Sequence, residues 1–310
     1  MASVSRMVTV RRGESDADIE CVRQVRLAVV PHERALTVAE MRAASGPDTV
    51  HLLAERDGKV LGSGLGDRSD LSGAAVVIAR VLPEFRRQGV GTELFRALLD
   101  HAARLGMDQV VSYADDVGSR SFAEHFGFVE VDRQVEQVRS IGAEPPVTAP
   151  DGVEFVTVAQ RPELWDVAYE RVGLQGFADM ALTAPMQVSL KQWRSEWIGA
   201  PEAMILALAD GEVIGVAGLM ADADHPERAE NALTAVRREW RGKGVASALK
   251  RSTLAWAAAN GIREVYTWTQ KGNADMRRLN EHLGYRTRLE SFTMRAPLKT
   301  IEHHRKLTKS

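Results

Sequence analysis

Two short basic segments decide the fold: FRRQGVG at Phe85–Gly91 and WRGKGVA at Trp240–Ala246. Each follows an apolar stretch that predicts a strand, VVIARVLP (76–83) or NALTAVRR (231–238), and leads directly into a sequence with helical spacing. A strand-to-helix junction presents unpaired backbone N–H groups at the positive end of the helix, and glycines allow a ligand to approach closely. The two segments therefore predict two sites for an anion, most naturally a phosphate.

The repeat extends on both sides of these segments. Upstream, LLAERDGKVLGSGLG (52–66) pairs with ILALADGEVIGVAGL (205–219), and the Asp-Gly inside each copy predicts a β-hairpin with a type I′ turn. Downstream, TELFRALLDHAARLG (92–106) pairs with SALKRSTLAWAAANG (247–261), and each copy predicts an amphipathic helix that ends at a glycine. A shared order over so many residues indicates a duplicated supersecondary unit.

A second pair of matching segments, together with the sequence between the two copies, predicts the domain organisation. SFAEHFGF (121–128) matches RLNEHLGY (278–285). Between the copies, IGAEPPVTAPDG (141–152) is rich in Pro, Gly and Ala without periodicity, which is typical of a linker. We therefore expect one domain over 1–140, a linker over 141–152 and a second domain over 153–310, in line with about 150 residues per domain.

Composition and charge limit the classes of molecule that the chain is expected to bind. The chain has 310 residues, with 40 basic and 42 acidic side chains and a formal net charge of -2, so nothing predicts binding to nucleic acid or to a membrane. The start lacks the apolar core of a signal peptide and no apolar span of membrane length occurs, which favours a cytoplasmic protein. No metal site is expected, and the excess of Arg over Lys suggests a GC-rich bacterial genome. A small molecule is the expected partner.

The absence of two common nucleotide-binding motifs limits which phosphate ligand is expected. The chain has neither G-x-x-x-x-G-K-[ST] nor a G-x-G-x-x-G with an acidic residue some twenty positions on. Instead, RRQGVG and RGKGVA resemble the Q/R-x-x-G-x-G/A signature of the Gcn5-related N-acetyltransferases (GNAT), and the tandem arrangement is similar to that of the mycothiol synthases and other actinobacterial tandem acetyltransferases. The resemblance implies an α/β fold with two tandem GNAT domains, each with a mixed sheet that splays open around acetyl-CoA.

The resemblance also implies which residues hold the cofactor. The loop would bind the pyrophosphate of acetyl-CoA, and the strand before it would offer backbone groups to the pantetheine arm. Carried onto this sequence, these residues are Val81, Arg86, Arg87, Gln88, Gly89, Val90 and Gly91 in the first half, and Val236, Arg241, Gly242, Lys243, Gly244, Val245 and Ala246 in the second.

Two positions after the fifth strand differ between the halves. The family places there an Asn that bonds the cofactor and, seven residues on, a Tyr that protonates the departing thiolate. The second half has Asn273 and Asn280, and the first half has Asp116 and Ala123. An ionised Asp only accepts hydrogen bonds and would face an anionic cofactor. The resemblance therefore makes Asn273 a cofactor ligand and Asn280 a candidate for the acid step.

A general base is also needed, because an amine must lose a proton before it attacks a thioester. The resemblance places that base at Glu230, where the first half has Ala75. Glu230 could equally be a solvated residue at a strand edge. Other acidic or basic side chains in the loop before this strand could serve instead: Asp222, Asp224, His225 and Glu227.

The acceptor is expected near the segment 182–199 of the second half. Trp193 and Trp197 lie four residues apart and so share one helix face. Facing a cleft, they would suit a partly apolar amine, although such a Trp pair is also typical of a core. The equivalent segment of the first half, 31–48, has no aromatic residue.

The sequence thus predicts an acetyl-CoA-dependent N-acetyltransferase acting on a primary amine of a small molecule. The second domain is expected to be catalytic and the first to be a degenerate copy. Two alternatives stay open. The first half, with its intact FRRQGVG loop, could be the active one, or the chain could be a non-catalytic sensor or scaffold that binds acyl-CoA.

Overall fold

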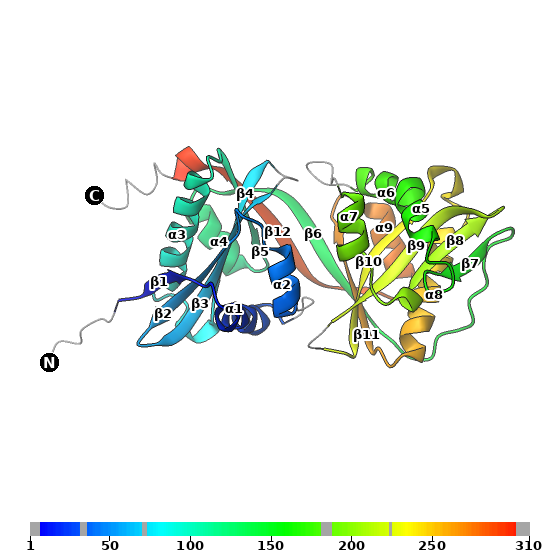
Figure 1. Cartoon of the computed structure of the whole chain (residues 1–310), viewed down its shortest axis with the longest axis horizontal. Coiled ribbons are helices and arrows are strands. Elements are labelled where there is room, and N and C mark those ends of the chain that lie inside the picture. The colour runs from blue at the N-terminus through cyan, green and yellow to red at the C-terminus, as the bar shows by residue number, and fades with distance from the viewer. Residues whose placement is uncertain (1–6, 32–35, 70–72, 181–187, 223–224, 302–310) are drawn as a thin grey trace. The chain divides into compact units, whose positions relative to one another are not determined.

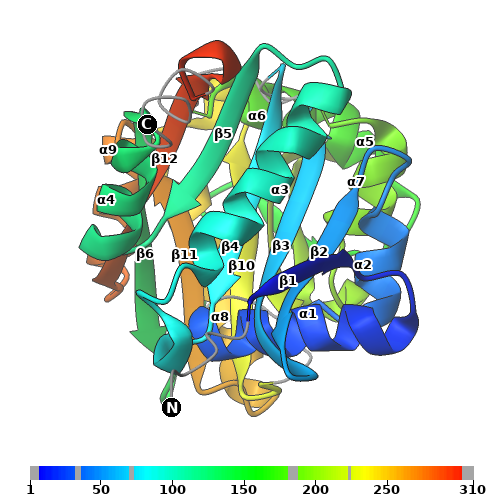
Figure 2. The same cartoon turned by 90° about the vertical axis from the view of Figure 1, so that its left-hand side faces the viewer.

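The computed structural model of the chain describes residues 7–31, 36–69, 73–180, 188–222 and 225–301. The fold is mixed α/β and divides into two compact units, shown in Figures 1 and 2. Unit 1 comprises Met1–Val131 together with Ser291–Ser310, and unit 2 comprises Asp132–Glu290. Each unit has a mixed sheet with helices packed on it, as the sequence predicts.

Unit 1 is built on a sheet in the order β1-β2-β3-β4-β5-β12, in which β4 and β5 are parallel. Helix α3 packs across β3 and β4 (Figure 2). The elements are β1 (Thr9–Arg12), α1 (Asp16–Val29), α2 (Val38–Ala44), β2 (Val50–Arg56), β3 (Lys59–Ser69), β4 (Ala74–Val81), α3 (Val90–Arg104), β5 (Gln109–Ala114), α4 (Val117–His125) and the second part of β12 (Arg286–Pro297).

Unit 2 repeats this plan with the order β6-β11-β10-β9-β8-β7, in which β10 and β11 are parallel. Helix α8 packs against β8, β9 and β10. The elements are β6 (Val129–Ser140), β7 (Glu154–Thr157), α5 (Leu164–Ala168), a π-helical turn at Tyr169–Gly173, α6 (Leu174–Ala178), α7 (Leu190–Glu196), β8 (Met204–Ala209), β9 (Glu212–Ala221), β10 (Arg228–Val236), α8 (Val245–Ala259), β11 (Glu264–Gln270) and α9 (Ala274–His282).

The last strand of each sequence half lies in the sheet of the other unit. Residues 134–140 of β6 pair with β11, and residues 292–297 of β12 pair with β5. Figure 1 shows β12, in red, among the strands of unit 1. The expected linker, 141–152, consequently lies inside unit 2, and the compact units differ from the two sequence halves by this exchange of strands.

The two predicted hairpins are confirmed in detail. Asp57 and Gly58 have φ values of 55° and 75°, and Asp210 and Gly211 have 49° and 79°. Positive φ at both central residues is the requirement of a type I′ turn. These turns join β2 to β3 and β8 to β9, and so they set the register of each sheet next to the strand that precedes the basic loop.

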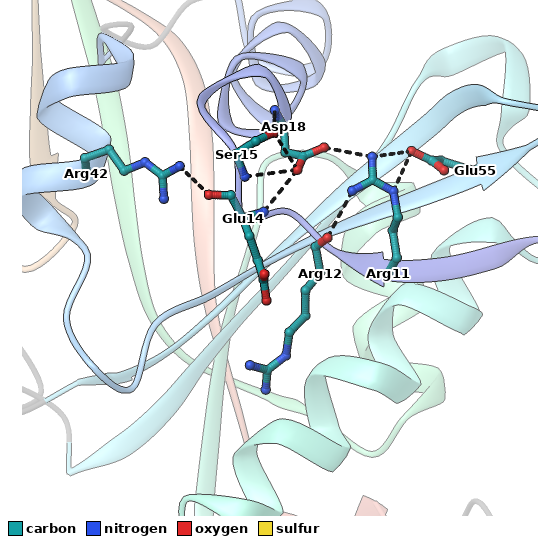
Figure 3. A network of polar contacts seen from close by, with 7 residues as sticks. All are labelled: Arg11, Arg12, Glu14, Ser15, Asp18, Arg42 and Glu55. Carbon is teal, nitrogen blue, oxygen red and sulfur yellow. Dashed lines mark hydrogen bonds and ion pairs between the residues drawn. The ribbon is translucent and has the colours of Figure 1, made fainter.

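A network of polar contacts joins the edge strand β1 of the unit 1 sheet to α1 and β2 (Figure 3). Arg11 on β1 lies 2.8 Å from Asp18 on α1 and 2.8 Å from Glu55 on β2. Asp18 also completes a capping box with Ser15 at the start of α1. The network ties the short strand β1 to its neighbours, because four residues alone form few ladder bonds.

Candidate active site

The two basic loops have the same backbone conformation. Positive φ occurs at the third and fifth positions of each seven-residue segment, with 61° at Arg87 and 82° at Gly89, and 73° at Gly242 and 80° at Gly244. Gly89 and Gly244 are the N-caps of α3 and α8, and no side chain of the described residues caps either helix. Each helix therefore starts without a side-chain cap from any described residue, and backbone N–H groups in such a turn are typical of anion sites. Anion binding itself stays a prediction.

The first arginine of each loop is fixed on the preceding strand. Arg86 Nε donates to the carbonyl of Val81 at 3.2 Å, and Arg241 Nε donates to the carbonyl of Val236 at 3.0 Å. The contact orients each guanidinium beside its loop. Positive charge thus lies next to both helix starts, where it favours a phosphate.

In unit 2 an acidic side chain also faces the loop. Asp179, just after α6, accepts hydrogen bonds from Arg241 at 2.5 Å and from Arg238. The hydrogen bond from Arg238 holds the pKa of Asp179 below its ordinary value. Asp179 and Arg241 both border the cavity described next, so the Arg241 guanidinium there is oriented by this carboxylate.

A cavity of about 680 Å³ opens in unit 2 where two parallel strands part. β10 pairs with β11 over 228–230 and 264–266, and beyond that point residues 231–236 and 267–270 form opposite walls of the cavity. The basic loop and the first turn of α8 complete it. The volume lies within the range of small-molecule and cofactor sites, about 300–1,000 Å³. The splayed sheet implied by the family resemblance is present here.

Most residues expected to hold the cofactor in the second half line this cavity: Val236, Arg241, Gly242, Gly244, Val245, Ala246 and Asn273. Lys243 lies instead over the ring of Trp240, 4.6 Å from its centroid. Asn273 is the N-cap of α9, and its side chain accepts a hydrogen bond from the backbone N–H of Met276 at 3.2 Å. The cofactor residues predicted from the second loop are thus brought together.

Glu230 and Asn280, expected to act in catalysis, lie in different surroundings. Glu230 is half-buried at the last residue of β10 that pairs with β11, directly at the point where the strands part. Asn280 is fully buried, and its amide donates to Gln137 at 2.9 Å and to Thr269 at 3.4 Å. Because Asn280 has no exposed surface, its position does not support a role in protonating a thiolate.

Of the other side chains considered as a base, Asp222 is buried and accepts a hydrogen bond from the backbone of His225 at 3.2 Å. Glu227 lies 3.9 Å from the His225 ring. Asp224 lies outside the described residues. Of these side chains, Glu230 is the one at the last pair of β10 and β11, next to the cavity-lining Asn231. Glu230 itself is not among the residues that line the cavity, whereas the carboxylates of Asp179 and Asp275 are.

The structure places Trp193 in the core of unit 2. Its side chain has no exposed surface, stacks on Trp165 with ring centroids 4.2 Å apart and donates to the Trp165 carbonyl at 3.0 Å. Trp197 is partly buried against Phe177, with centroids 4.8 Å apart. The burial of Trp193 supports a role of this pair in core packing and not in binding an acceptor. Residues 181–187, before these tryptophans, lie outside the described residues.

A buried polar pair at the cavity, Lys250 and Asn231, was missed from the sequence. Lys250 on α8 is 1% exposed, and its Nζ donates to Asn231 Oδ1 on β10. Burial lowers the pKa of Lys250 to about 7. The signal was present: Lys250 lies three, four and seven residues before Thr253, Leu254 and Ala257, on the apolar face of the helix.

In unit 1 aromatic side chains occupy the positions equivalent to cavity-lining residues of unit 2. Phe95 corresponds to Lys250, and Phe122 corresponds to Leu279. The two rings lie 5.5 Å apart, and Phe122 also lies 3.7 Å from the place of a Cβ at Gly91. In the basic loop of unit 1, the Gln88 side chain donates a hydrogen bond to the Glu84 carbonyl at 3.1 Å.

The described residues contain neither a helix that could span a membrane nor a metal-binding cluster. None of the helices in the described ranges is long and apolar enough to cross a bilayer. Likewise, the part of the chain that the structure describes contains no group of three or more His, Cys, Asp or Glu side chains able to hold a metal ion.

Comparisons with known proteins agree with this geometry. The model of the acetyltransferase (GNAT) family matches residues 22–128 and again residues 169–285. Mycothiol acetyltransferase of Actinosynnema mirum is 28% identical over 265 residues, which cover 83% of this chain and 86% of that protein. Among solved structures, a GCN5-related N-acetyltransferase from Sphaerobacter thermophilus superposes with a TM-score of 0.72 at 19% identity, covering 94% and 96% of the two chains. A tandem GNAT protein from the clavulanic acid biosynthesis pathway also reaches 0.72, at 18% identity, covering 94% and 99%.

Proposed function

Because the chain belongs to the acetyltransferase (GNAT) family, and is thus an N-acetyltransferase that uses acetyl-CoA, we propose that its unit 2 transfers the acetyl group to a primary amine of a small molecule. The observation that carries the proposal is the cavity of about 680 Å³ between β10, β11 and the start of α8. It extends from the start of α8, a kind of site that favours anions, along β10 to Asn231, the residue next to Glu230. Unit 1 would be a degenerate copy that supports the fold.

The pyrophosphate of acetyl-CoA would bind at the loop of unit 2. The backbone N–H groups after Gly244 and the guanidinium of Arg241 supply donors there. The pantetheine arm would then run along β10 between the parted strands, towards residue 230. This direction brings the thioester to the end of the cavity at which β10 and β11 join.

Glu230 would act as the general base. The attacking amine carries an extra proton in neutral solution, and the carboxylate would accept it, directly or through a water molecule. The nitrogen then forms a bond to the acetyl carbon, and the carbon–sulfur bond breaks. Backbone N–H groups of β10 would stabilise the negative charge on the carbonyl oxygen of the tetrahedral intermediate. Water would supply the proton to the departing thiolate.

The acceptor is proposed to be a small amine on two grounds. The relative from Actinosynnema mirum is named as an acetyltransferase of mycothiol, a small molecule. In addition, the volume of this cavity lies in the range of sites that bind small molecules and cofactors.

Matched glycine variants test which unit works. Gly244→Ala and Gly89→Ala place the same Cβ at the same N-cap conformation, and neither Cβ would meet a heavy atom of the described residues within 4 Å. Each costs about 1–2 kcal/mol of backbone strain, so their stabilities match. We expect Gly244→Ala to weaken acetyl-CoA binding at least tenfold by calorimetry and to reduce thiol release with a panel of small primary amines.

Gly89→Ala should leave transfer within about threefold of the unchanged protein. If Gly89→Ala abolishes transfer and Gly244→Ala does not, unit 1 is the active unit. If the unchanged protein binds acetyl-CoA but transfers to no amine of the panel, the chain is an acyl-CoA-binding sensor or scaffold and the proposal fails.

A further inference from the structure

The strand that borders the cavity in unit 2 differs in its pairing from its counterpart in unit 1. In unit 1, β3 and β4 pair in one continuous register from Gly62 opposite Val81 to Ser69 opposite Ala74. In unit 2, the register of β9 and β10 shifts between Asn231 and Thr234. A bulge of this kind inserts one residue, bends the strand and leaves backbone groups outside the ladder.

Asn231 connects the two ends of the bulge in β10 and contacts the neighbouring strands β9 and β11. Its Nδ2 donates to the carbonyl of Gly218 on β9 at 3.2 Å and to Thr234 Oγ1, at the far end of the bulge, at 3.3 Å. Its own carbonyl accepts from Thr267 Oγ1 on β11 at 3.4 Å. Asn231 is 4% exposed, so these contacts are shielded from water and specify one conformation of the bulge.

Lys250 holds Asn231 from the helix side. Its ammonium or amine Nζ donates to Asn231 Oδ1 and lies 5.1 Å from the centroid of the Tyr285 ring. With this contact the side-chain oxygen and nitrogen of Asn231 are both engaged. Lys250, Asn231 and Thr234 all border the cavity.

An apolar pair would pack at these two positions at lower cost. Unit 1 has Phe95 and Val76 there, and Phe95 is 2% exposed in a well-filled core. Burying an amine without a carboxylate partner is unfavourable, and apolar replacements of buried polar groups are often neutral or stabilising. Core packing therefore does not account for Lys250, and its contact with the bulge is the feature that distinguishes unit 2.

We propose that Lys250 and Asn231 are positioning residues for acetyl transfer: together they hold the bulge of β10 in the form that orients the acetyl end of acetyl-CoA. This inference rests on the proposed function of unit 2. Ala232 and Leu233, inside the bulge, border the cavity, so the backbone there can reach a thioester carbonyl. A misplacement of about 1 Å at such a point lowers a rate by about 10²-fold.

The test removes the polar contact while keeping side chains of similar size, in the double variant Asn231→Leu with Lys250→Met. Binding of coenzyme A and of acetyl-CoA labelled with ¹³C at the carbonyl is measured by calorimetry, and the carbonyl resonance of the bound label is recorded by NMR. We expect coenzyme A affinity within about threefold of the unchanged protein, because the loop is untouched. The carbonyl resonance, displaced in the unchanged protein, should return towards its position in free acetyl-CoA.

Retention of the full displacement in the double variant would overturn the proposal while leaving the proposed function intact. Failure of the unchanged protein to bind acetyl-CoA would instead refute the proposed function and the inference with it. Lys250→Met, which keeps the length of the side chain and removes the donor, decides the question in the same way should the double variant not fold. Lys299→Met, at an exposed lysine of unit 1, is the matched control and should keep the displaced resonance.

Discussion

Glu230 has two properties that suit the proposed general base, although it borders the cavity only through its neighbour Asn231. It lies on the strand that would carry the cofactor, and it is the last residue of β10 to pair with β11. The residue is half-buried. The equivalent position in unit 1 is Ala75, which is 1% exposed and cannot accept a proton.

Glu230→Gln should therefore lower the turnover number by about 10²–10⁴ and leave the affinity for acetyl-CoA within about twofold, because only proton transfer is lost. Steady-state kinetics with a responsive amine and calorimetry with acetyl-CoA measure the two effects. Glu239→Gln, at an exposed residue that pairs with Arg237, is the control and should change neither. An unchanged turnover number in Glu230→Gln would remove this residue from the mechanism.

Lys250 should give the protein a distinctive dependence of stability on pH. Its pKa is about 7 in the folded chain and about 10.4 in an unfolded chain. Between these values the unfolded state binds one more proton, so the free energy of unfolding rises with pH, by up to about 1.4 kcal/mol per pH unit. Below pH 7 both states are protonated and the slope from this group vanishes.

Urea unfolding at a series of pH values checks this expectation. The difference in stability between the unchanged protein and Lys250→Met should shift in favour of the unchanged protein as pH rises from 7 to 10. Lys243→Met should follow the unchanged protein. A constant difference for Lys250→Met would mean that Lys250 titrates alike in both states.

Individual residues differ in how far sequence alone could place them. The Asp-Gly turns and the loop glycines were predictable, because positive φ is a local demand that few residue types satisfy. Asn280 and Trp193 were assigned to the site, yet they lie in the interior. Their burial follows from packing against Gln137 and Trp165, which are 143 and 28 residues away. No local pattern contains those contacts.

At the scale of single elements, the strand-loop-helix units were the most predictable part. Helices α3 and α8 begin at the residue after each N-cap glycine and run for 15 residues each, close to the predicted ranges. Their apolar spacing and glycine stops are local signals. The bulge in β10 had no such signal, because a register shift is a property of the pairing of β10 with β9 and not of β10 alone.

At the scale of the whole molecule, the exchange of β6 and β12 ties each unit to the other half of the sequence. A sequence repeat locates two copies, but it does not say which sheet the last strand of each copy joins. Both choices bury the same apolar pattern on the same kind of strand edge. The predicted tandem organisation is confirmed by the family matches, and the exchange was visible only in the pairing of β6 with β11 and of β12 with β5.

Cutting the chain inside 141–152 should therefore give fragments that are unstable alone. The fragment 1–140 would lack the strand that pairs with β5, and the fragment 153–310 would lack the strand that pairs with β11. We expect each to show little cooperative unfolding by circular dichroism, and co-expression to restore a folded complex by size-exclusion chromatography. A control cut within Gly46–Thr49, where a turn connects α2 to β2, leaves both strands with their partners in cis. Cooperative unfolding of either isolated half would contradict this expectation.

The position of β12 has a consequence for synthesis on the ribosome. Domains generally fold from the N-terminal side as they emerge, at about 5–20 residues per second. Here the strand that completes unit 1 is translated after every other described strand, so β5 waits with an open edge for roughly 180 residues of further chain. Unit 2, whose strands all precede residue 291, can close first. The N-terminal unit is thus the last to be finished, and a ribosome that stalls before β12 leaves an aggregation-prone intermediate.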